Sequence, residues 1–562
     1  MSRSSDAGEN RGVTEFRREH YLAALGIFSV YLGLRVFTWT QTALLEDHDS
    51  VALMLWAEPF ARFDLIGILQ LDPDASLFYP LLIGLFSLPG WSFEAGARLA
   101  TLASSAVLFG SVLGIGRQIA SPGAVLIGLM LLAVNPELVR FSIAVLTEPT
   151  YVATVYVGLL LFWLQYRRPT LIGAAALGVV FGLAFLNRME GILFVVFVPF
   201  MLTLYYLWEK PQDYDFKWLV VWCLLFLSVF LALAVAHVWR VSHEMGAFAI
   251  NGRQAWTLLL NSPPAVGDWV AYNERLYGLD FDPAVVNIVY VKQHFSAVLG
   301  LTTGNGESAE LLLNYIKALI VNLDDLYSRR LTDLFGHLVI VLFVFGLVHL
   351  YAVGRVFDVT LIIVFLALVL IAPLLHNVVV RHILVMAPIV LVVSGIGVVS
   401  LSKIVLTRTS RWPISVGVLA GVITAVVIAG WAMPLRGVFN PPDRNDEYSM
   451  AELREPIRII AESFEGDRGR PPRVATRQRY LPYFSGAEWV ALPFVEFDGL
   501  VAYSKLNEVD FVYLTHQAEI FPFAPAFDGD EYGQMFTLLY RHSSDVNGRM
   551  SALYRFNGGS EE

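Results

Sequence analysis

The hydrophobic residues of this 562-residue chain lie in long unbroken blocks, separated by short polar links. A helix of ~20 apolar residues is long enough to cross a lipid bilayer. We predict eleven membrane spans, near residues 21–40, 97–116, 122–140, 149–166, 170–187, 190–208, 218–239, 336–353, 358–375, 383–402 and 414–434. The pattern therefore predicts an all-α polytopic membrane bundle.

The basic residues of the links indicate which side of the membrane each link faces. Short cytoplasmic loops are enriched in Lys and Arg. When the Arg-rich segment 1–20 is placed inside, every predicted inside loop contains at least one basic residue: Arg117, Arg167, Lys210, Arg355 and Lys403. We therefore expect a cytoplasmic N-terminus, a first span that is retained as an anchor, and a C-terminus outside the cytoplasm.

One apolar block, Leu77–Leu88, does not fit this scheme as a span. Its ~12 residues are too few to cross the hydrocarbon core comfortably. Counting it would also put the loops that carry Arg117 and Arg167 on opposite sides. We predict an interfacial or re-entrant helix on the outer surface.

The chain divides into a cytoplasmic tail (1–20), a transmembrane module (21–434) with outer loops at 41–96 and 241–335, and an extracytoplasmic domain (435–562). The last of these contains strand-like runs in PRVATR, EWVALPF and DFVYLTH, with a helix-like stretch near Leu500–Leu506. Short β-rich runs of this kind, interrupted by a helical stretch, are typical of a small α/β domain.

Composition excludes several classes of protein. Hydrophobic residues make up 56% of the chain and charged residues 16%, whereas soluble domains average ~45–50% and ~25%. The net charge of −10 gives no sign of a nucleic-acid partner. Cys223 is the only cysteine, so an intrachain disulfide and a cysteine-rich metal site are both excluded.

Ionisable residues gather where four separate links reach the outer face. Asp47 and Asp49 follow the first span, and Glu148, Arg188 and Arg381 stand on later outer links. Charges at membrane depth cost ~2.5–3.5 kcal/mol each on insertion scales. Taken alone, Glu148 also suits the first turn of a helix, and the two arginines also suit snorkelling to lipid headgroups. The convergence of four links favours a functional site.

Six short motifs, in this order, resemble those of the GT-C superfamily of integral-membrane glycosyltransferases. The similarity is greatest to the protein O-mannosyltransferase and aminoarabinose transferase branch and covers residues 15–435. The motifs are Asp47–Ala57, Tyr79–Leu82, Trp91–Leu99, Leu146–Pro149, Leu186–Gly191 and Arg381–Pro388. Three positions depart from the pattern: Ser50 replaces an acid, Leu53 replaces a tyrosine, and Tyr79 replaces the first residue of a Pro-Pro pair.

The resemblance implies that a sugar is taken from a dolichyl- or polyprenyl-phosphate carrier and given to an acceptor hydroxyl on the extracytoplasmic face, with inversion. It implies Asp49 as general base, with Asp47 as the alternative, and Glu148 as the group that orients acceptor or sugar or assists the base. Arg381, Arg188 and, more weakly, Lys292 are candidates to hold the donor phosphate. No metal and no cofactor is expected, since the lipid-linked sugar is the substrate.

Two other functions remain open on the residues alone: a transporter or flippase for a lipid-linked or anionic substrate, and a catalytically inactive scaffold that binds lipid carriers. The chain shows no internal repeat of the kind common in transporters. The expected partners are the lipid-linked donor, membrane lipids, and a protein, lipid or polysaccharide acceptor. The expected location is a bacterial plasma membrane. The sugar and the oligomeric state are not encoded in any recognisable pattern.

Overall fold

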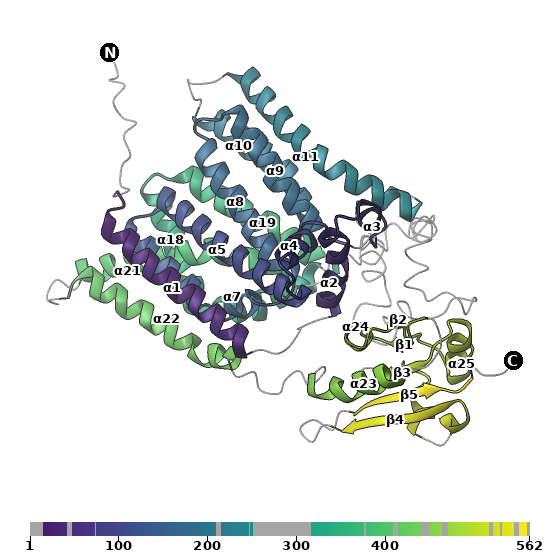
Figure 1. Ribbon diagram of the computed structural model, residues 1–562. Coiled ribbons are helices and arrows are strands. Elements are labelled where there is room, and N and C mark those ends of the chain that lie inside the picture. Colours follow the sequence, from purple (N-terminus) through teal and green to yellow (C-terminus); the bar gives the residue numbers. More distant parts are fainter. Residues whose placement is uncertain are drawn as a thin grey trace, which may run out of the picture.

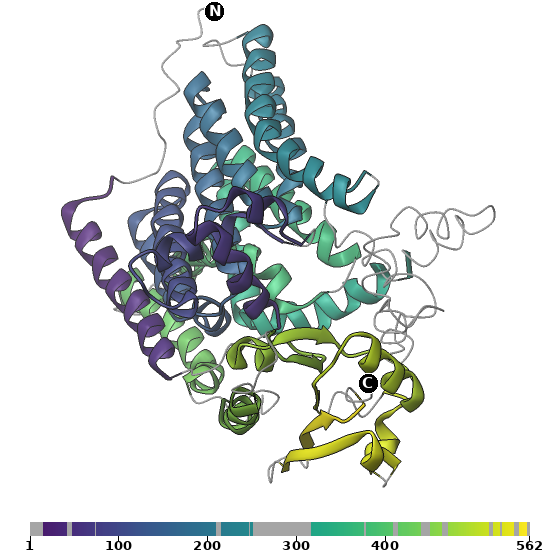
Figure 2. The same cartoon turned by 45° about the vertical axis from the view of Figure 1, so that its right-hand side comes forward.

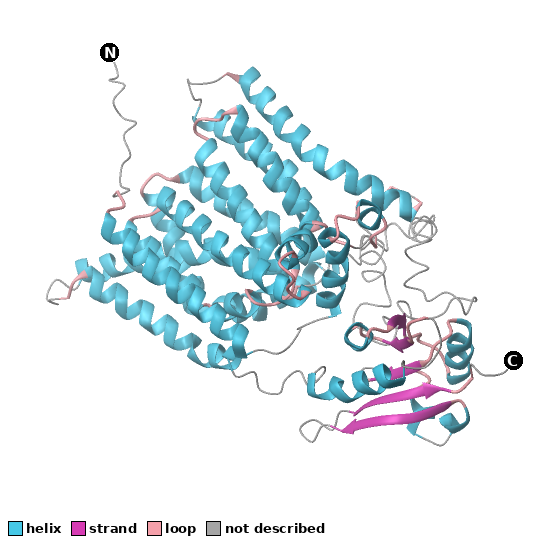
Figure 3. Ribbon diagram, in the orientation of Figure 1, coloured by secondary structure: helices cyan, strands magenta, loops and turns pink. Residues whose placement is uncertain are grey.

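The computed structural model shows a helical bundle with a small sheet domain beside it (Figures 1 and 3). It describes residues 15–41, 48–72, 75–209, 215–246, 248–250, 316–317, 319–375, 378–408, 414–439, 450–463, 470–515, 521–528, 531–543 and 550–558. A helix lies at each of the eleven predicted spans. In the described residues, seven helices are long and apolar enough to cross a membrane, or up to eight if a bent pair counts as one span.

The first half of the bundle begins with the long helix α1 and ends with the long helix α11. Its elements are α1 (Arg18–Gln41), α2 (His48–Ala61), α3 (Leu65–Leu69), α4 (Phe78–Ser87), α5 (Phe93–Ile119), α6 (Pro122–Val134), α7 (Pro136–Phe141), α8 (Thr147–Gln165), α9 (Leu171–Asn187), the 3-10 helix η1 (Met189–Leu193), α10 (Phe194–Glu209) and α11 (Phe216–Met245).

The second half of the bundle contains the most deeply buried span. Its elements are the π-helix η2 (Leu326–Arg330), α17 (Leu331–Phe335), α18 (His337–Ala352), α19 (Val356–Leu375), α20 (Val380–Ile383), the 3-10 helix η3 (Leu384–Met386), α21 (Ala387–Arg408) and α22 (Val416–Phe439). In the segment Val380–Arg408, 94% of the most apolar 18-residue stretch is buried inside the protein. α21 therefore forms the centre of the bundle, packed between α18 and α6.

One predicted span is interrupted in the structure, and another begins at a sharp bend. The span predicted at 122–140 is divided between α6 and α7 at Asn135, which is extended because Pro136 follows it. The Asn135 side chain accepts a hydrogen bond from Leu138 N–H and so caps α7. The helix that leads into α18 bends by 93° at Gly336, whose φ of 73° is a conformation that favours glycine.

The acidic outer loop predicted at 41–96 contains more helix than the sequence analysis expected. In α2 the side chains of Val51, Met54 and Ala57 are fully buried, and their spacing of three residues places them on one face. α4 coincides with the short apolar block Leu77–Leu88 and packs against α2 and α5. The outer segment is thus an ordered helical layer over one end of the bundle.

The C-terminal domain contains α23 (Met450–Ser463), β1 (Arg473–Thr476), α24 (Tyr480–Ser485), β2 (Glu488–Ala491), α25 (Phe497–Leu506), β3 (Phe511–Leu514), α26 (Ala524–Asp528), the 3-10 helix η6 (Glu531–Gln534), β4 (Phe536–Ser543) and β5 (Met550–Phe556). The strand order is β2-β1-β3-β5-β4. β1 pairs in parallel with β2 and β3, while β5 is antiparallel to β3 and β4. The predicted strands and helix are present, and β4 and β5 were not foreseen.

This domain packs against the outer helical layer, beside α2 (Figure 2). One buried apolar cluster includes Trp56 of α2, Tyr79 of α4 and Tyr480 of α24. Burial raises the pKa of the Tyr483 hydroxyl, and the nearby carboxylates of Glu94 and Glu58 raise it further. The sheet domain is therefore held at the end of the bundle where α2 begins.

Candidate active site

Four chain segments bring ionisable side chains to one end of the bundle, which we call the rim. Glu148 lies in the first turn of α8, and Asp49 lies in the first turn of α2. Arg188 follows the last residue of α9, and Arg381 lies on α20. Each residue stands at or beside a helix end, so each side chain can reach the space beyond the apolar part of the bundle.

The most buried part of the rim is a network of one guanidinium and two carboxylates. Arg188 Nη1 lies 2.6 Å from Glu148 Oε1, and Arg188 Nη2 lies 2.8 Å from Glu190 Oε1. Arg188 Nε also donates to Glu190 Oε2 at 3.3 Å, so that pair is bidentate. The Glu148 side chain is only 6% exposed. A buried carboxylate is costly without a partner, and Arg188 supplies that partner for Glu148.

Arg381 joins this network to Asp49. Its Nε lies 3.9 Å from Glu148 Oε1, and its Nη1 lies 3.7 Å from Asp49 Oδ2. These are ion-pair distances rather than hydrogen-bond distances. The side chains of Arg381 and Asp49 are about one-third exposed, at 31% and 30%. The rim therefore combines two buried salt bridges, from Arg188 to Glu148 and Glu190, with a more exposed ion pair between Arg381 and Asp49.

The turn that carries Arg188 depends on a close approach between backbones. Arg188 is extended, and η1 turns back at once against the end of α9. A Cβ on Gly191 would lie 2.4 Å from Phe185 N, so only glycine fits there. Asn187 Nδ2 donates to Thr147 O at 3.0 Å, which ties the end of α9 to the start of α8. Arg188 and Glu148 are held together by this backbone arrangement.

Asp49 is positioned through α4. Leu77 N–H donates to Leu186 O at 2.8 Å, which attaches the start of α4 to the end of α9. The fully buried Tyr79 hydroxyl lies 2.7 Å from Thr101 Oγ1 on α5. α2 packs on α4. α4 thus connects α2 to the end of α9.

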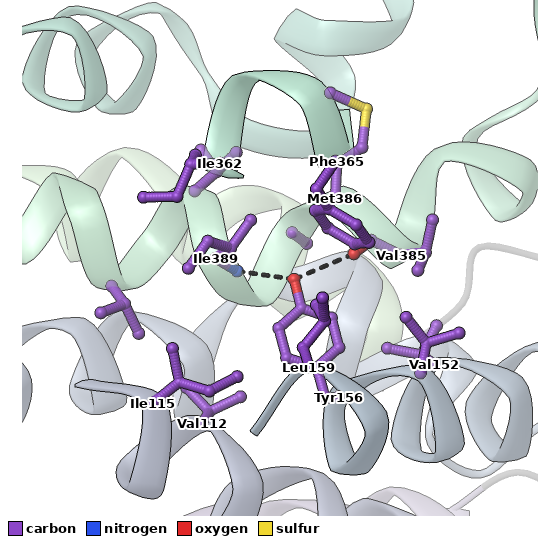
Figure 4. Close-up of a cluster of buried hydrophobic side chains, with 14 of the residues drawn as sticks. Val112, Ile115, Val152, Tyr156, Leu159, Ile362, Phe365, Val385, Met386 and Ile389 are labelled. Atoms are coloured by element: carbon purple, nitrogen blue, oxygen red, sulfur yellow. Dashed lines mark hydrogen bonds between the residues drawn. The ribbon is translucent and has the colours of Figure 1, made fainter. Parts of the chain in front are cut away.

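The chain that follows Arg381 is bonded to a tyrosine that was not among the residues predicted from the sequence. The hydroxyl of Tyr156 donates to Val385 O at 3.0 Å and accepts from Ile389 N–H at 2.8 Å, among apolar side chains of α5, α8 and α19 (Figure 4). These two bonds span the break between η3 and α21. In the sequence, the one sign that Tyr156 makes these bonds is that its hydroxyl lies within an apolar span.

A small cleft opens among these groups. Its polar lining includes Glu148, Arg188, Glu190, Arg381 and His382, and its apolar lining includes Pro373 and Val385. Its inner volume of about 20 Å³ holds about one water molecule. A sugar or phosphate group can enter only if Arg381 or its neighbours move.

The structure places the sequence-predicted residues as follows. It brings together Asp49, Glu148, Arg188 and Arg381, while Asp47 and Lys292 lie outside the described residues. Glu190 and His382 also line the cleft. Arg140 is not part of the rim network in the described residues, and its Nη1 lies 3.8 Å from Glu137 Oε2 within α7. In the part of the chain that is described, no three His, Cys, Asp or Glu side chains form a group able to hold a metal ion.

The apolar helices define a multi-pass membrane protein, and comparison with solved structures shows that the bundle has the GT-C fold. No protein-family model and no curated protein matches the chain.

One similar solved structure is the oligosaccharyltransferase AglB from Archaeoglobus fulgidus, in complex with an inhibitory peptide and a dolichol-phosphate. The match covers 97% of this chain and 75% of that chain, at 12% identity and a TM-score of 0.58. Another is ArnT from Cupriavidus metallidurans bound to undecaprenyl phosphate. That match covers 97% of this chain and 100% of the other, at 11% identity and a TM-score of 0.50.

Proposed function

We propose that the protein is a glycosyltransferase that moves a sugar from a polyprenyl-phosphate carrier to an acceptor hydroxyl on the extracytoplasmic face. The observation that carries the proposal is the position of the Arg381 guanidinium between the carboxylates of Asp49 and Glu148. The complexes of similar proteins with dolichol-phosphate and undecaprenyl phosphate support a lipid-phosphate donor.

Asp49 is the proposed general base. Its side chain is 30% exposed, whereas that of Glu148 is 6% exposed and paired with Arg188. An acceptor hydroxyl therefore reaches Asp49 more easily. Asp49 takes the hydroxyl proton, the oxygen forms a bond to the anomeric carbon, and the bond from that carbon to the phosphate oxygen breaks. Direct displacement of this kind inverts the anomeric centre.

Arg381 is the proposed ligand of the leaving phosphate. Negative charge builds on the phosphate in the transition state, and a guanidinium can bind two of its oxygens at once. The Arg381 side chain is 31% exposed, so a phosphate can reach its guanidinium. Lys292 stays a weaker candidate for the same role.

Arg188 is proposed to act mainly on the neighbouring carboxylates. It already makes short bonds to Glu148 and bidentate bonds to Glu190. A donor phosphate near this guanidinium would gain from its charge while Glu148 stays in place. Glu148 then presents its remaining oxygen to the acceptor or to the sugar, or assists the base.

We propose that transfer needs no metal ion, because two arginines supply the positive charge that the leaving phosphate requires. A chelator such as EDTA should then leave the rate unchanged. A rate that falls with EDTA and returns with Mg²⁺ or Mn²⁺ would contradict this. We place the enzyme in a bacterial plasma membrane, with the N-terminus in the cytoplasm and the C-terminal domain outside.

The test of the proposal is the substitution Asp49→Asn, which keeps the shape of the side chain and removes the base. We expect transfer to fall by about 10²- to 10⁴-fold. Wild type and variants would be expressed in a strain that lacks the gene, and mass spectrometry would compare sugar-modified lipids, polysaccharides and proteins. Binding of undecaprenyl phosphate, followed by native mass spectrometry, should be unchanged.

The matched control is Asp498→Asn, which removes an exposed carboxylate from the C-terminal domain and should leave transfer intact. Full transfer by Asp49→Asn would show that another group, Asp47 first, is the base. Movement of an intact lipid-linked sugar across reconstituted vesicles, without transfer, would favour a flippase instead.

A further inference from the structure

A second cavity lies at the end of the bundle opposite the rim. It is formed where the α5–α6 link, the last turn of α18 and the second half of α21 meet; α18 and α21 run side by side (Figure 1). Its volume of about 140 Å³ is several times that of the rim cleft. Along α21, Lys403 is 16 residues from Ala387, which places the cavity ~24 Å from the rim.

The polar lining of this cavity is basic. Lys403, Arg355 and His349 line it together with Ser121 and Ser400, and the lining contains no Asp or Glu. Arg355 Nε is paired with Asp358 at 2.7 Å, and His349 Nδ1 lies 3.1 Å from Ser400 Oγ. Within the described residues Lys403 forms no ion pair, and it is exposed. The Lys403 ammonium is therefore the charge that a ligand can neutralise.

The start of α6 adds further hydrogen-bond donors. Ser121 and Ala120 line the cavity, and the Ser121 side chain makes no capping hydrogen bond to α6. The first N–H groups of a helix have no partner within the helix, and the helix dipole favours an anion near them. An anion bound beside Lys403 would face these N–H groups.

The remaining lining is apolar and comes from membrane helices, including Ile396 and Val399 of α21 and Leu350 of α18. A basic pocket with apolar walls between membrane helices suits a lipid that has an anionic headgroup. The basic residues of the links predict that this end of the bundle faces the cytoplasm. A free phosphate ion would use the basic groups but not the apolar walls.

We propose that this cavity binds the phosphate group of an anionic phospholipid from the cytoplasmic leaflet, with Lys403 as its main charged ligand. The site is separate from the rim, and the proposal does not depend on the transferase activity. The lipid would fill the space between α6, α18 and α21 and so hold these helices together.

The test uses the full-length protein in a neutral detergent. Apparent affinities for phosphatidylglycerol, phosphatidylcholine and inorganic phosphate would be measured by native mass spectrometry and by the ligand-dependent rise in Tm. The variants are Lys403→Gln and, as a matched control, Lys217→Gln, an exposed lysine at the start of α11 outside the cavity. The Tm of each variant without lipid checks that it is folded.

We expect phosphatidylglycerol to bind more tightly than phosphatidylcholine. Lys403→Gln should weaken phosphatidylglycerol binding by about 10- to 100-fold, as loss of a charged hydrogen-bond donor does, while Lys217→Gln should have no effect. Equal weakening by both variants would overturn the proposal in favour of general surface charge. Unchanged binding in Lys403→Gln, or equal protection by inorganic phosphate alone, would overturn it as well.

Discussion

The two ends of the bundle both carry buried ion pairs, but the pairs are built differently. At the rim, the carboxylates of Asp49, Glu148 and Glu190 meet the guanidiniums of Arg188 and Arg381. These residues come from four segments, since only Arg188 and Glu190 are close in sequence. At the opposite end, Asp358 pairs with Arg355 three residues away. Asp358 also accepts a hydrogen bond from Trp163 Nε1 at 3.0 Å.

The difference separates an arrangement suited to chemistry from one suited to holding helices together. At the opposite end, one carboxylate is satisfied by neighbours that belong to its own link and to α8. At the rim, carboxylates outnumber guanidiniums and one pair is partly exposed, so a base and a phosphate ligand both remain within reach of substrates. Substitutions at the two ends should therefore separate stability from transfer.

The largest effect is expected from Arg188→Met, which leaves Glu148 and Glu190 without their shared partner. Removal of one member of a buried salt bridge costs about 3–5 kcal/mol, and transfer should be lost with it. Thermal unfolding in detergent would measure the first effect, and the transfer assay the second.

A second variant distinguishes the cause of that instability. Arg188→Met combined with Glu148→Gln no longer has an unpaired Glu148 charge, so it should regain part of the lost stability without regaining transfer. If the double variant is as unstable as the single one, the Glu148–Arg188 bond is not what holds the end of α9 to α8. The bond from Asn187 to Thr147 would then be the stronger candidate.

The next effect in size is expected from Arg381→Gln. Loss of a group that stabilises developing charge lowers kcat by about 10²- to 10³-fold, and binding of undecaprenyl phosphate should weaken. Stability should change little, because Arg381 lies at ion-pair distances and is one-third exposed. Arg62→Gln is the control, since Arg62 pairs with Glu58 on α2 at 72% exposure. Wild-type donor binding in Arg381→Gln would rule out the proposed role.

The sequence predicted the bundle and much of the rim because both follow from local rules. Long apolar blocks predict spans, and Glu148, Arg188 and Arg381 stand on links whose side was indicated by basic residues elsewhere. The roles of these residues remain predictions. The helical character of α2 was not foreseen, because the interpretation of segment 41–96 gave more weight to its acids than to the spacing of Val51, Met54 and Ala57.

Other features depend on contacts between distant segments, which no local pattern encodes. Tyr156 looks like any aromatic residue of an apolar span until α21 is placed beside α8. The bidentate bond between Arg188 and Glu190 requires the sharp turn that Gly191 permits. Likewise, β4 and β5 pair with each other and with β3 only after the chain returns to the sheet.

A smaller loss of stability, without a loss of transfer, is expected from Asp358→Asn at the opposite end. The variant leaves Arg355 without its ion partner and should destabilise the protein by about 1–3 kcal/mol. Transfer per folded molecule should stay at the wild-type level, because Asp358 stands at the start of α19 whereas the rim lies at its end. A loss of transfer out of proportion to the loss of folded protein would show that the two ends are coupled.

The smallest chemical change is the substitution Tyr156→Phe, which removes one hydroxyl and keeps the ring. Val385 O and Ile389 N–H then lose the partner that joins η3 to α21, at a cost of about 1–3 kcal/mol. Only η3 separates this break from α20, which carries Arg381. Transfer should therefore fall several-fold further than in Asp358→Asn at equal folded protein. Tyr31→Phe is the matched control, since its buried hydroxyl bonds to Ser105 O on α5. If both tyrosine variants lose stability but keep full transfer, Tyr156 only supports packing, and Arg381 is held in place by its carboxylate neighbours.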